Sequence, residues 1–346
     1  AGHGPSQSPL VRSRGLPSQG GIMTRVLSCT DLRIEIDGRP VVDGTSLSIA
    51  AGETLALVGE SGCGKSMTAL GLIRLLPDAA RLTGGQIDLQ GDRLDQLSER
   101  QMNRLRGNRL AMIFQEPVAS LDPLMPVGRQ IAEALGRDTD MTRAAVDAKV
   151  QDFLIRVGID RPEVRARQYP FQLSGGMCQR VMIAMAMIRQ PILLIADEPT
   201  TALDVTIQKQ ILQLMADLRR ETGSAVLLIT HDMGVVSESA DRVAVMYAGR
   251  IVETGGVAQV FAGPRHPYTA MLLRTIPRLD SPRKVALPAI AGAVPDIRDW
   301  PQGCRFHPRC PLATDRCRSE APPLATVTPD HRTACWHHDR IASDLP

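Results

Sequence analysis

The chain has 346 residues, enough for two domains, with 43% hydrophobic residues and a formal net charge of only +3 at pH 7. So weak a charge argues against nucleic acid as a partner, because nucleic-acid-binding domains usually concentrate basic residues on one face. No apolar run approaches the roughly 18 residues of a membrane span, and the densest, residues 181–188, is bracketed by Arg180 and Arg189. These features predict a soluble protein that could still dock on a membrane protein.

Composition divides the chain into three parts. Residues 1–22 are rich in Gly, Ser and Pro and contain neither acidic residues nor an apolar segment. We interpret them as an expression tag or a disordered leader rather than a secretory signal. Residues 23–262 have the periodic patterns of a folded domain, whereas residues 263–346 are rich in Pro, Arg and Cys and contain five of the seven histidines.

The folded part reads as short strands separated by helical stretches. Residues 27–51 predict strands, with a turn at residues 37–40, and residues 95–190 predict a helical arm. Buried strands are predicted at residues 55–58, 191–197 and 225–230, and a hairpin at residues 242–255 that turns at Ala248–Gly249. Continuous apolar strands of this kind indicate a parallel sheet that is covered on both faces.

A phosphate-binding loop is the first chemical motif. Residues 59–66, GESGCGKS, match the pattern G-x-x-x-x-G-K-[ST] between a predicted strand and a predicted helix. Glycines let backbone N–H groups surround phosphate, Lys65 supplies positive charge to the β and γ phosphates, and the Ser66 hydroxyl can bind Mg²⁺. The alternative is an ordinary strand–turn–helix with a surface lysine. The candidate nucleotide-binding residues are Gly59, Glu60, Ser61, Gly62, Cys63, Gly64, Lys65, Ser66 and Met67.

Two acidic residues form the second motif. Asp197 ends the strand of residues 191–197, where its carboxylate can hold a metal ion through water. Glu198 follows and can act as the general base that polarises an attacking water. Paired acids at a strand end are often only solvated, but the phosphate-binding loop favours the catalytic interpretation.

Further motifs follow in a fixed order: Gln115, LSGG at residues 173–176, TALD at residues 201–204, and His231. Together with GESGCGKS and ADEP they make residues 25–262 resemble the nucleotide-binding subunit of an ATP-binding-cassette (ABC) transporter. The resemblance implies an α/β P-loop NTPase fold. It would have a mixed sheet with a RecA-like core, an N-terminal antiparallel β subdomain and a helical arm, followed here by a small, irregular, Cys-rich extension.

The same resemblance assigns roles to three more residues. Gln115 would contact Mg²⁺ and sense the γ phosphate, and His231 would clamp the γ phosphate and the attacking water. Asp204 would belong to a loop that communicates across a dimer. From the residues alone, a buried, hydrogen-bonded histidine remains the alternative for His231.

A second candidate phosphate-binding site, in addition to the P-loop, lies at Ser174, Gly175 and Gly176. The helix that follows has apolar residues at 177, 181, 185 and 188, so one face is buried and its N-terminus can meet an anion. Two phosphate-binding sites in one chain predict a head-to-tail dimer. In this dimer ATP contacts the P-loop of one protomer and the Ser174–Gly176 turn of the other. A helix N-cap without a ligand is the alternative.

Two positions depart from the family pattern, and one cysteine lies inside the P-loop. Met177 replaces the usual Gln after the second glycine, and Ile36 stands where many members stack an aromatic ring on adenine. Adenine would then rest on an aliphatic surface, with looser base selectivity. Cys63 is either redox-sensitive or simply a tolerated small residue.

Four cysteines, Cys304, Cys310, Cys317 and Cys335, follow in the spacing C-x5-C-x6-C-x17-C. Residues 263–277, GCRFHPRCP and HRTACW resemble the extension of ATPase subunits from oligopeptide and dipeptide importers, which subunits for nickel or glutathione import can share. The resemblance implies ligands of a structural [4Fe–4S] cluster. Spacing alone leaves zinc and unligated thiols open. Four histidines are either substitute ligands or groups at the surface and around the site: His307, His331, His337 and His338.

These resemblances imply an ATPase subunit of a bacterial importer for di- or oligopeptides, bound peripherally to the cytoplasmic face of the inner membrane. Its cofactors would be ATP, Mg²⁺ and the cluster. Its partners would be a second ATPase subunit, identical or related, two transmembrane permease subunits and an extracytoplasmic solute-binding protein, with no nucleic acid. Nickel, glutathione or another small solute is an alternative cargo. A soluble regulatory or repair ABC ATPase and a non-enzymatic, iron-sensing nucleotide binder are rival functions.

Overall fold

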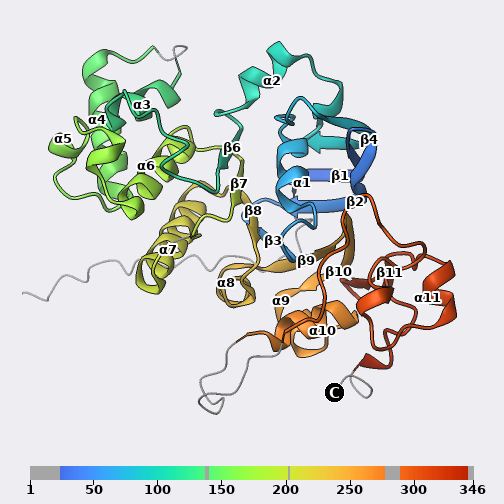
Figure 1. Ribbon diagram of the computed structural model, residues 1–346. Helices are drawn as coiled ribbons and strands as arrows, with labels where there is room; N and C mark the ends of the chain where they lie inside the picture. The colour runs from blue at the N-terminus through green and yellow to red at the C-terminus, as the bar shows by residue number, and fades with distance from the viewer. Residues whose placement is uncertain (1–23, 137–139, 202, 277–288, 342–346) are drawn as a thin grey trace, which may run out of the picture.

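The computed structural model describes residues 24–136, 140–201, 203–276 and 289–341, so the proposed leader at residues 1–22 lies outside it. Two sheets form the framework, one of four strands and one of eight. A lobe of helices lies to one side of the larger sheet, and the C-terminal residues lie at the opposite end of the molecule (Figure 1). The expected cassette architecture is confirmed.

The smaller sheet is antiparallel, with strand order β2-β1-β4-β5. Residues 37–38 turn the chain between the two long strands with positive φ at both positions, as a two-residue hairpin requires. This is the turn that the sequence predicts. Its strands are β1 (Arg25–Ile36), β2 (Arg39–Ala50), β4 (Ala80–Leu89) and β5 (Asp92–Arg93).

The larger sheet has the order β11-β12-β10-β9-β3-β8-β7-β6. Strands β6, β7, β8, β3 and β9 are parallel neighbours, and the rest pair antiparallel. Every residue of β3, β7 and β8 is buried, which explains their unbroken apolar sequences. The strands are β3 (Thr54–Val58), β6 (Leu110–Ile113), β7 (Leu193–Asp197), β8 (Ala225–Thr230), β9 (Arg242–Tyr247), β10 (Arg250–Gly256), β11 (Ala325–Thr328) and β12 (His331–Thr333).

The helices cover both faces of this sheet. Helices α3 to α6 form the separate lobe, and its apolar core continues onto β7 and α7 (Figure 1). No helix in the described part of the chain is long and apolar enough to span a membrane. The α-helices are α1 (Lys65–Leu72), α2 (Glu99–Leu105), α3 (Val127–Ala134), α4 (Arg143–Arg156), α5 (Pro162–Arg165), α6 (Gly175–Met187), α7 (Val205–Thr222), α8 (Met233–Ser239), α9 (Val257–Ala262), α10 (Pro267–Arg274) and α11 (Asp315–Ser319), and the 3-10 turns are η1 (Leu94–Gln96), η2 (Pro170–Gln172) and η3 (His307–Arg309).

The helical arm differs from the sequence prediction at its N-terminal end. Residues 95–190 include β6, which pairs with β7 as the edge strand of the large sheet. Four residues, Leu110–Ile113, are too few to distinguish a strand from part of a buried helix by periodicity. The helical lobe therefore begins only after Ile113.

The C-terminal residues are more closely joined to the cassette than their composition suggests. Strand β12 pairs with β10, so β11 and β12 extend the large sheet itself. Glu253 on β10 is fully buried, and its carboxylate accepts hydrogen bonds from the backbone N–H groups of Arg265 and His266. The Nε2 of His331 on β12 lies 2.7 Å from the same carboxylate. His331 therefore has a structural partner and is not a free metal ligand.

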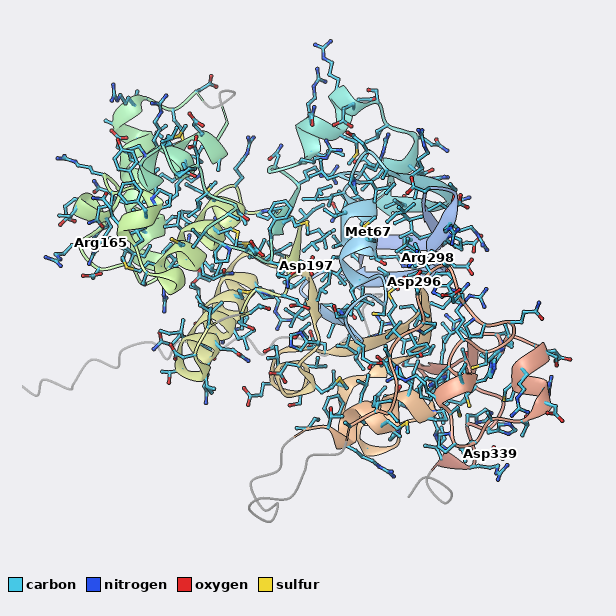
Figure 2. The ribbon with its side chains drawn as sticks, in the orientation of Figure 1. Met67, Arg165, Asp197, Asp296, Arg298 and Asp339 are labelled. Atoms are coloured by element: carbon cyan, nitrogen blue, oxygen red, sulfur yellow. The ribbon has the colours of Figure 1, made fainter. Side chains whose placement is uncertain are left out.

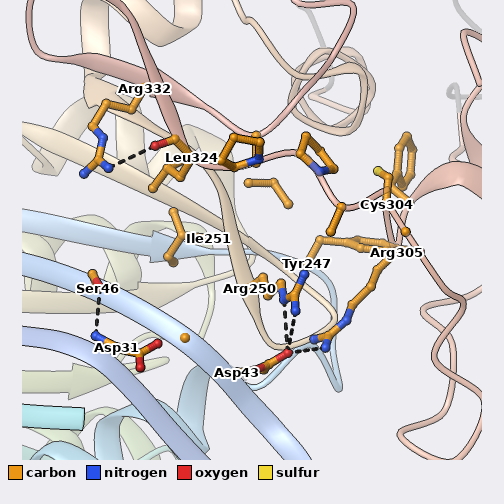
Figure 3. Close-up of a pocket in the computed structure, with 18 of the residues that line it drawn as sticks. Asp31, Asp43, Ser46, Tyr247, Arg250, Ile251, Cys304, Arg305, Leu324 and Arg332 are labelled. Carbon is orange, nitrogen blue, oxygen red and sulfur yellow. Dashed lines mark hydrogen bonds and ion pairs between the residues drawn. The ribbon is translucent and has the colours of Figure 1, made fainter. Parts of the chain in front are cut away.

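Asp43 ties the small sheet to this extension, and Figure 3 shows it paired with Arg250 and Arg305. Asp43 on β2 accepts hydrogen bonds from Arg33, from Arg250 on β10 and from the largely buried Arg305. Burial raises the pKa of Asp43, but the hydrogen bonds and charges of Arg250 and Arg305 more than offset this and hold that pKa below the usual value of an aspartate. Arg305 also stacks 3.6 Å from the ring centroid of Trp300.

We expect Asp43→Ala to lower the free energy of unfolding by about 3 kcal/mol, because it leaves the buried Arg305 without its anionic partner. Asp31→Ala is the matched control, since Asp31 is an exposed carboxylate that also pairs with Arg33. Asp31→Ala should lower the free energy of unfolding by less than about 1 kcal/mol. Thermal unfolding at pH 7 measures both, and equal effects would contradict the central role of Asp43.

Candidate nucleotide site

The P-loop lies between β3 and α1, as the sequence predicts. Lys65 is only 5% exposed, and its Nζ donates to the backbone oxygens of Gly59 at 2.8 Å and Glu60 at 3.1 Å. These bonds hold the ammonium group inside the loop. The first N–H groups of α1 have no helical partner, so the loop and the helix start together form a site for anionic oxygens.

Close backbone contacts explain the glycines at the two ends of the loop. A Cβ atom at Gly59 would lie 2.3 Å from the carbonyl oxygen of Met246 and 2.7 Å from the Cys63 Sγ. A Cβ at Gly64 would lie 2.9 Å from the carbonyl oxygen of Val41, and its φ is +106°. At Gly62 a Cβ would meet nothing within 4 Å.

Cys63 is buried beneath the loop rather than displayed to a reactant. Burial raises the pKa of its thiol, and the nearby charge of Lys65 offsets this only in part. A thiol in such surroundings is a poor nucleophile. The geometry therefore favours a packing role over redox sensitivity.

Asp197 ends β7 at the same edge of the sheet (Figure 2). It is 5% exposed, and burial raises its pKa, which the hydrogen bond from Ser66 partly offsets. Its Oδ1 has no hydrogen-bond partner among the described residues. A hydroxyl beside a buried, unpaired carboxylate oxygen fits a hard cation such as Mg²⁺, which prefers oxygen ligands.

Glu198 is held by three neighbours. Its backbone has a positive φ of 46°, and its N–H donates to the carbonyl oxygen of Ile229 on β8. Gln115 Nε2 donates to Oε2 at 3.0 Å, Thr201 Oγ1 donates to the same oxygen at 2.9 Å, and His231 Nδ1 lies 3.2 Å from Oε1. His231 is 62% exposed, so it is not the buried, structural histidine that was the alternative.

One cavity of about 660 Å³ lies between the P-loop and the side chains around Glu198. It brings Gly59, Glu60 and Ser61 together with Gln115, Glu198 and His231. Its remaining lining residues come from the C-terminal part of the chain: Leu272, Thr275, Ala289 and Ile290.

The second predicted phosphate-binding site, the Ser174–Gly176 turn, lies outside the P-loop cavity. Ser174 is exposed at the start of α6, and its side chain accepts a hydrogen bond from the backbone N–H of Met177 at 3.3 Å. Among the described residues that line the P-loop cavity, Ser174, Gly175 and Gly176 do not occur. Asp204 is also exposed and caps α7 through the N–H groups of Thr206 and Ile207.

The four C-terminal cysteines line one small cavity, which also contacts His307 and His337. Burial raises the pKa of Cys310 to about 11 and of Cys335 to about 12. In the part of the chain that the structure describes, however, no group of three or more His, Cys, Asp or Glu side chains is close enough to hold a metal ion. The cysteines thus share a cavity without forming a compact ion site.

Three contacts at the nucleotide site were missed by the sequence analysis. Thr201 belongs to the TALD motif, but its hydrogen bond to Glu198 was not predicted. Tyr268 and Arg309 of the extension contact Glu60 of the P-loop. No pattern in the sequence links residue 60 with residues 268 and 309, because only the folded chain brings them together.

Comparisons with known proteins agree with this geometry. The chain matches the family model for ABC transporters over residues 42–201, and the model for the oligopeptide/dipeptide transporter C-terminal region over residues 252–317. A probable peptide ABC transporter ATP-binding protein from Sinorhizobium fredii is 51% identical over 301 residues, which are 87% of this chain and 90% of that protein. The chain belongs to the ATP-binding subunits of ABC transporters.

A second relative supports this family, and a solved structure supports the fold. The dipeptide transport ATP-binding protein DppD of Bacillus subtilis is 46% identical over 325 residues, which are 92% of this chain and 97% of that protein. The dimeric ATP-binding cassette MJ0796, solved with ADP and Pi, is 24% identical and covers 67% of this chain with a TM-score of 0.60, over 98% of its own length. The chain is thus an ABC transporter ATPase.

We predict that Gly59→Ala lowers the affinity of this ABC ATPase for ATP at least tenfold, because the added methyl group displaces the loop from Met246. Gly62→Ala, where a methyl group has room, should lower it by only a few-fold through the strain of a positive φ. Equilibrium binding of a fluorescent ATP analogue compares the two. Equal losses would show that the contact with Met246 is unimportant.

Proposed function

We propose that this chain hydrolyses MgATP at the interface of two cassettes and thereby drives the import of di- or oligopeptides. The observation that carries the proposal is the side chain of Glu198, oriented by Gln115, Thr201 and His231 at the mouth of the P-loop cavity. A protein that only binds nucleotide needs no such oriented carboxylate. This favours an ATPase over the non-enzymatic regulator.

The chemistry assigned to each residue follows from its position. Glu198 accepts the proton of the attacking water, while Gln115 and His231 orient that water against the γ phosphate. Lys65 and the N–H groups at the start of α1 hold the phosphates. Ser66, Asp197 and Gln115 would hold Mg²⁺, which neutralises charge on the phosphate oxygens when it is bound.

The Ser174–Gly176 turn supports a dimer. It is exposed and preorganised at a helix start, yet it contributes nothing to its own P-loop cavity in the described chain. A second protomer, turned head to tail, can place this turn on the triphosphate and Asp204 near the contact. Each nucleotide then joins two chains, and hydrolysis separates them. Ile36 is half-buried beside the core, so adenine would rest on an aliphatic surface.

We expect Glu198→Gln to lower ATP turnover at least about 100-fold, because the amide cannot accept the proton. The variant should still bind MgATP and accumulate as a dimer. Adding Ser174→Arg should abolish that dimer by placing bulk and charge where the partner's phosphate binds. Turnover assays, and light scattering with MgATP, measure the two effects.

Glu133→Gln is the control, since Glu133 is exposed on α3 and pairs with Arg129 within the same helix. Full turnover by Glu198→Gln would show that Glu198 is not the general base. A dimer that persists in the double variant would instead show that the Ser174–Gly176 turn does not bind the partner's nucleotide. The two outcomes therefore test the base and the turn separately.

Docking on membrane subunits is supported by apolar residues on either side of Gln115 in the sequence. Phe114, Val118 and Leu124 are 39%, 55% and 86% exposed, and an apolar partner surface would cover them. We propose that the chain binds two transmembrane permease subunits at the cytoplasmic face of the inner membrane, and that an extracytoplasmic solute-binding protein delivers their solute. The names of the peptide-transport relatives support a peptide cargo over nickel or glutathione.

For the cysteine cavity we propose a [4Fe–4S] cluster rather than zinc. The four cysteines line a common cavity, and four thiolates are the usual ligand set of such a cluster. The resemblance of this extension to that of oligopeptide and dipeptide importer ATPases favours the cluster over zinc. When bound, the cluster supplies a structural cross-link.

We expect anaerobically purified protein to contain about four iron and four sulfide per chain, with a broad visible absorption that is lost in Cys310→Ser. Cys178→Ser is the control, because Cys178 is a buried cysteine of α6, remote in sequence from the cavity. One equivalent of zinc without sulfide would favour the alternative ion. Absence of both metals would show that the four thiols are unligated.

A further inference from the structure

The extension reaches the P-loop through Arg309. Its Nη1 and Nη2 donate to the two carboxylate oxygens of Glu60 at 2.7 and 3.0 Å, which is a two-armed ion pair. Glu60 is the second residue of the phosphate-binding loop and lines the cavity shared with Glu198. Residues 249 positions apart in the sequence are thus joined at the site where the nucleotide binds.

Arg309 is fixed in this position from several sides. Its side chain is 6% exposed, and Nε donates to the carbonyl oxygen of Ala291 at 2.8 Å. Nη2 lies 3.3 Å from the carbonyl oxygens of Ile290 and Gly292. A guanidinium group held by so many acceptors cannot move away from Glu60 without leaving several of them unsatisfied.

The backbone of Glu60 is held by the extension as well. Its N–H donates to the hydroxyl of the buried Tyr268 on α10 at 2.9 Å. That N–H therefore has a protein acceptor and does not point into the phosphate site. Both the main chain and the side chain of Glu60 are turned toward the extension.

The charge of Glu60 gives these contacts a consequence for nucleotide binding. A free carboxylate in the P-loop would face the triphosphate, and like charges in a partly buried site repel strongly. Arg309 neutralises this carboxylate and directs it away from the loop interior. Lys65 does not neutralise the Glu60 carboxylate, since its ammonium group donates hydrogen bonds to backbone oxygens within the loop.

We propose that Arg309 is a positioning residue for ATP binding, which neutralises Glu60 and holds it away from the phosphates. The extension is then part of the nucleotide site and sets its affinity. This inference uses the ATPase activity and the P-loop, and it is independent of whether the neighbouring cysteines bind a metal.

The test is a double-mutant cycle on the full chain with a fluorescent ATP analogue and Mg²⁺. Arg309→Gln should weaken binding about tenfold when Glu60 is present, because the carboxylate becomes free. In the Glu60→Gln background the same change should weaken binding less than twofold. The loss caused by Arg309→Gln should also shrink when salt is raised from 50 to 500 mM, since salt screens the repulsion.

Arg316→Gln is the matched control, because Arg316 is an exposed arginine of the same extension and pairs with Glu320. It should leave ATP affinity unchanged. An equal loss on Arg309→Gln in both backgrounds, or no loss in either, would overturn the proposal. Should Arg309→Gln prevent folding, Arg309→Lys applies the same cycle: a loss of about threefold that Glu60→Gln removes supports the proposal, and a loss that persists overturns it.

Discussion

The parallel pairing of β3, β8 and β7 is the constraint on which the site depends. Parallel strands present their carboxyl ends at one edge of the sheet. The P-loop follows β3, Glu198 follows β7, and His231 follows β8, so three distant segments are placed together. The strands are buried on both faces, so the catalytic groups stand on a rigid support. A slip of one residue in this register would separate the base from the phosphates.

The cavity beside Glu198 is lined in this chain by the P-loop, Gln115, His231 and residues of the extension. The Ser174–Gly176 turn is not among these lining residues, so in the proposed dimer it meets the nucleotide of the partner protomer. The N-terminus of α6 suits that proposed role, since the first N–H groups of a helix favour anions. The helical lobe holds this start on a core continuous with β7 and α7. Its position relative to the catalytic edge is therefore determined by packing rather than by a loop.

The sequence was most informative where function restricts the choice of residue. GESGCGKS, Asp197 and Glu198 each need a specific chemical group at a specific strand end, and their elements were predicted with nearly the observed bounds. Strand β6 was missed because four apolar residues have no distinguishing period. The place of β11 and β12 could not be predicted either, because edge pairing with β10 depends on tertiary contacts such as Glu253 with His331. Contacts of Glu60 with Tyr268 and Arg309 leave no local signal at all.

The extension also links the cysteine cavity to the P-loop. Arg305 follows Cys304, and it donates to the carbonyl oxygen of Ala248, next to Gly249, whose N–H bonds the P-loop at Cys63. Arg309 precedes Cys310 and binds Glu60. The same short segment thus lines the cavity and contacts the P-loop, directly at Glu60 and through the β9–β10 turn. Any group that fixes these cysteines necessarily fixes the backbone that carries both arginines. The conformation of residues 304–310 therefore bears on the cysteine cavity and on the P-loop alike.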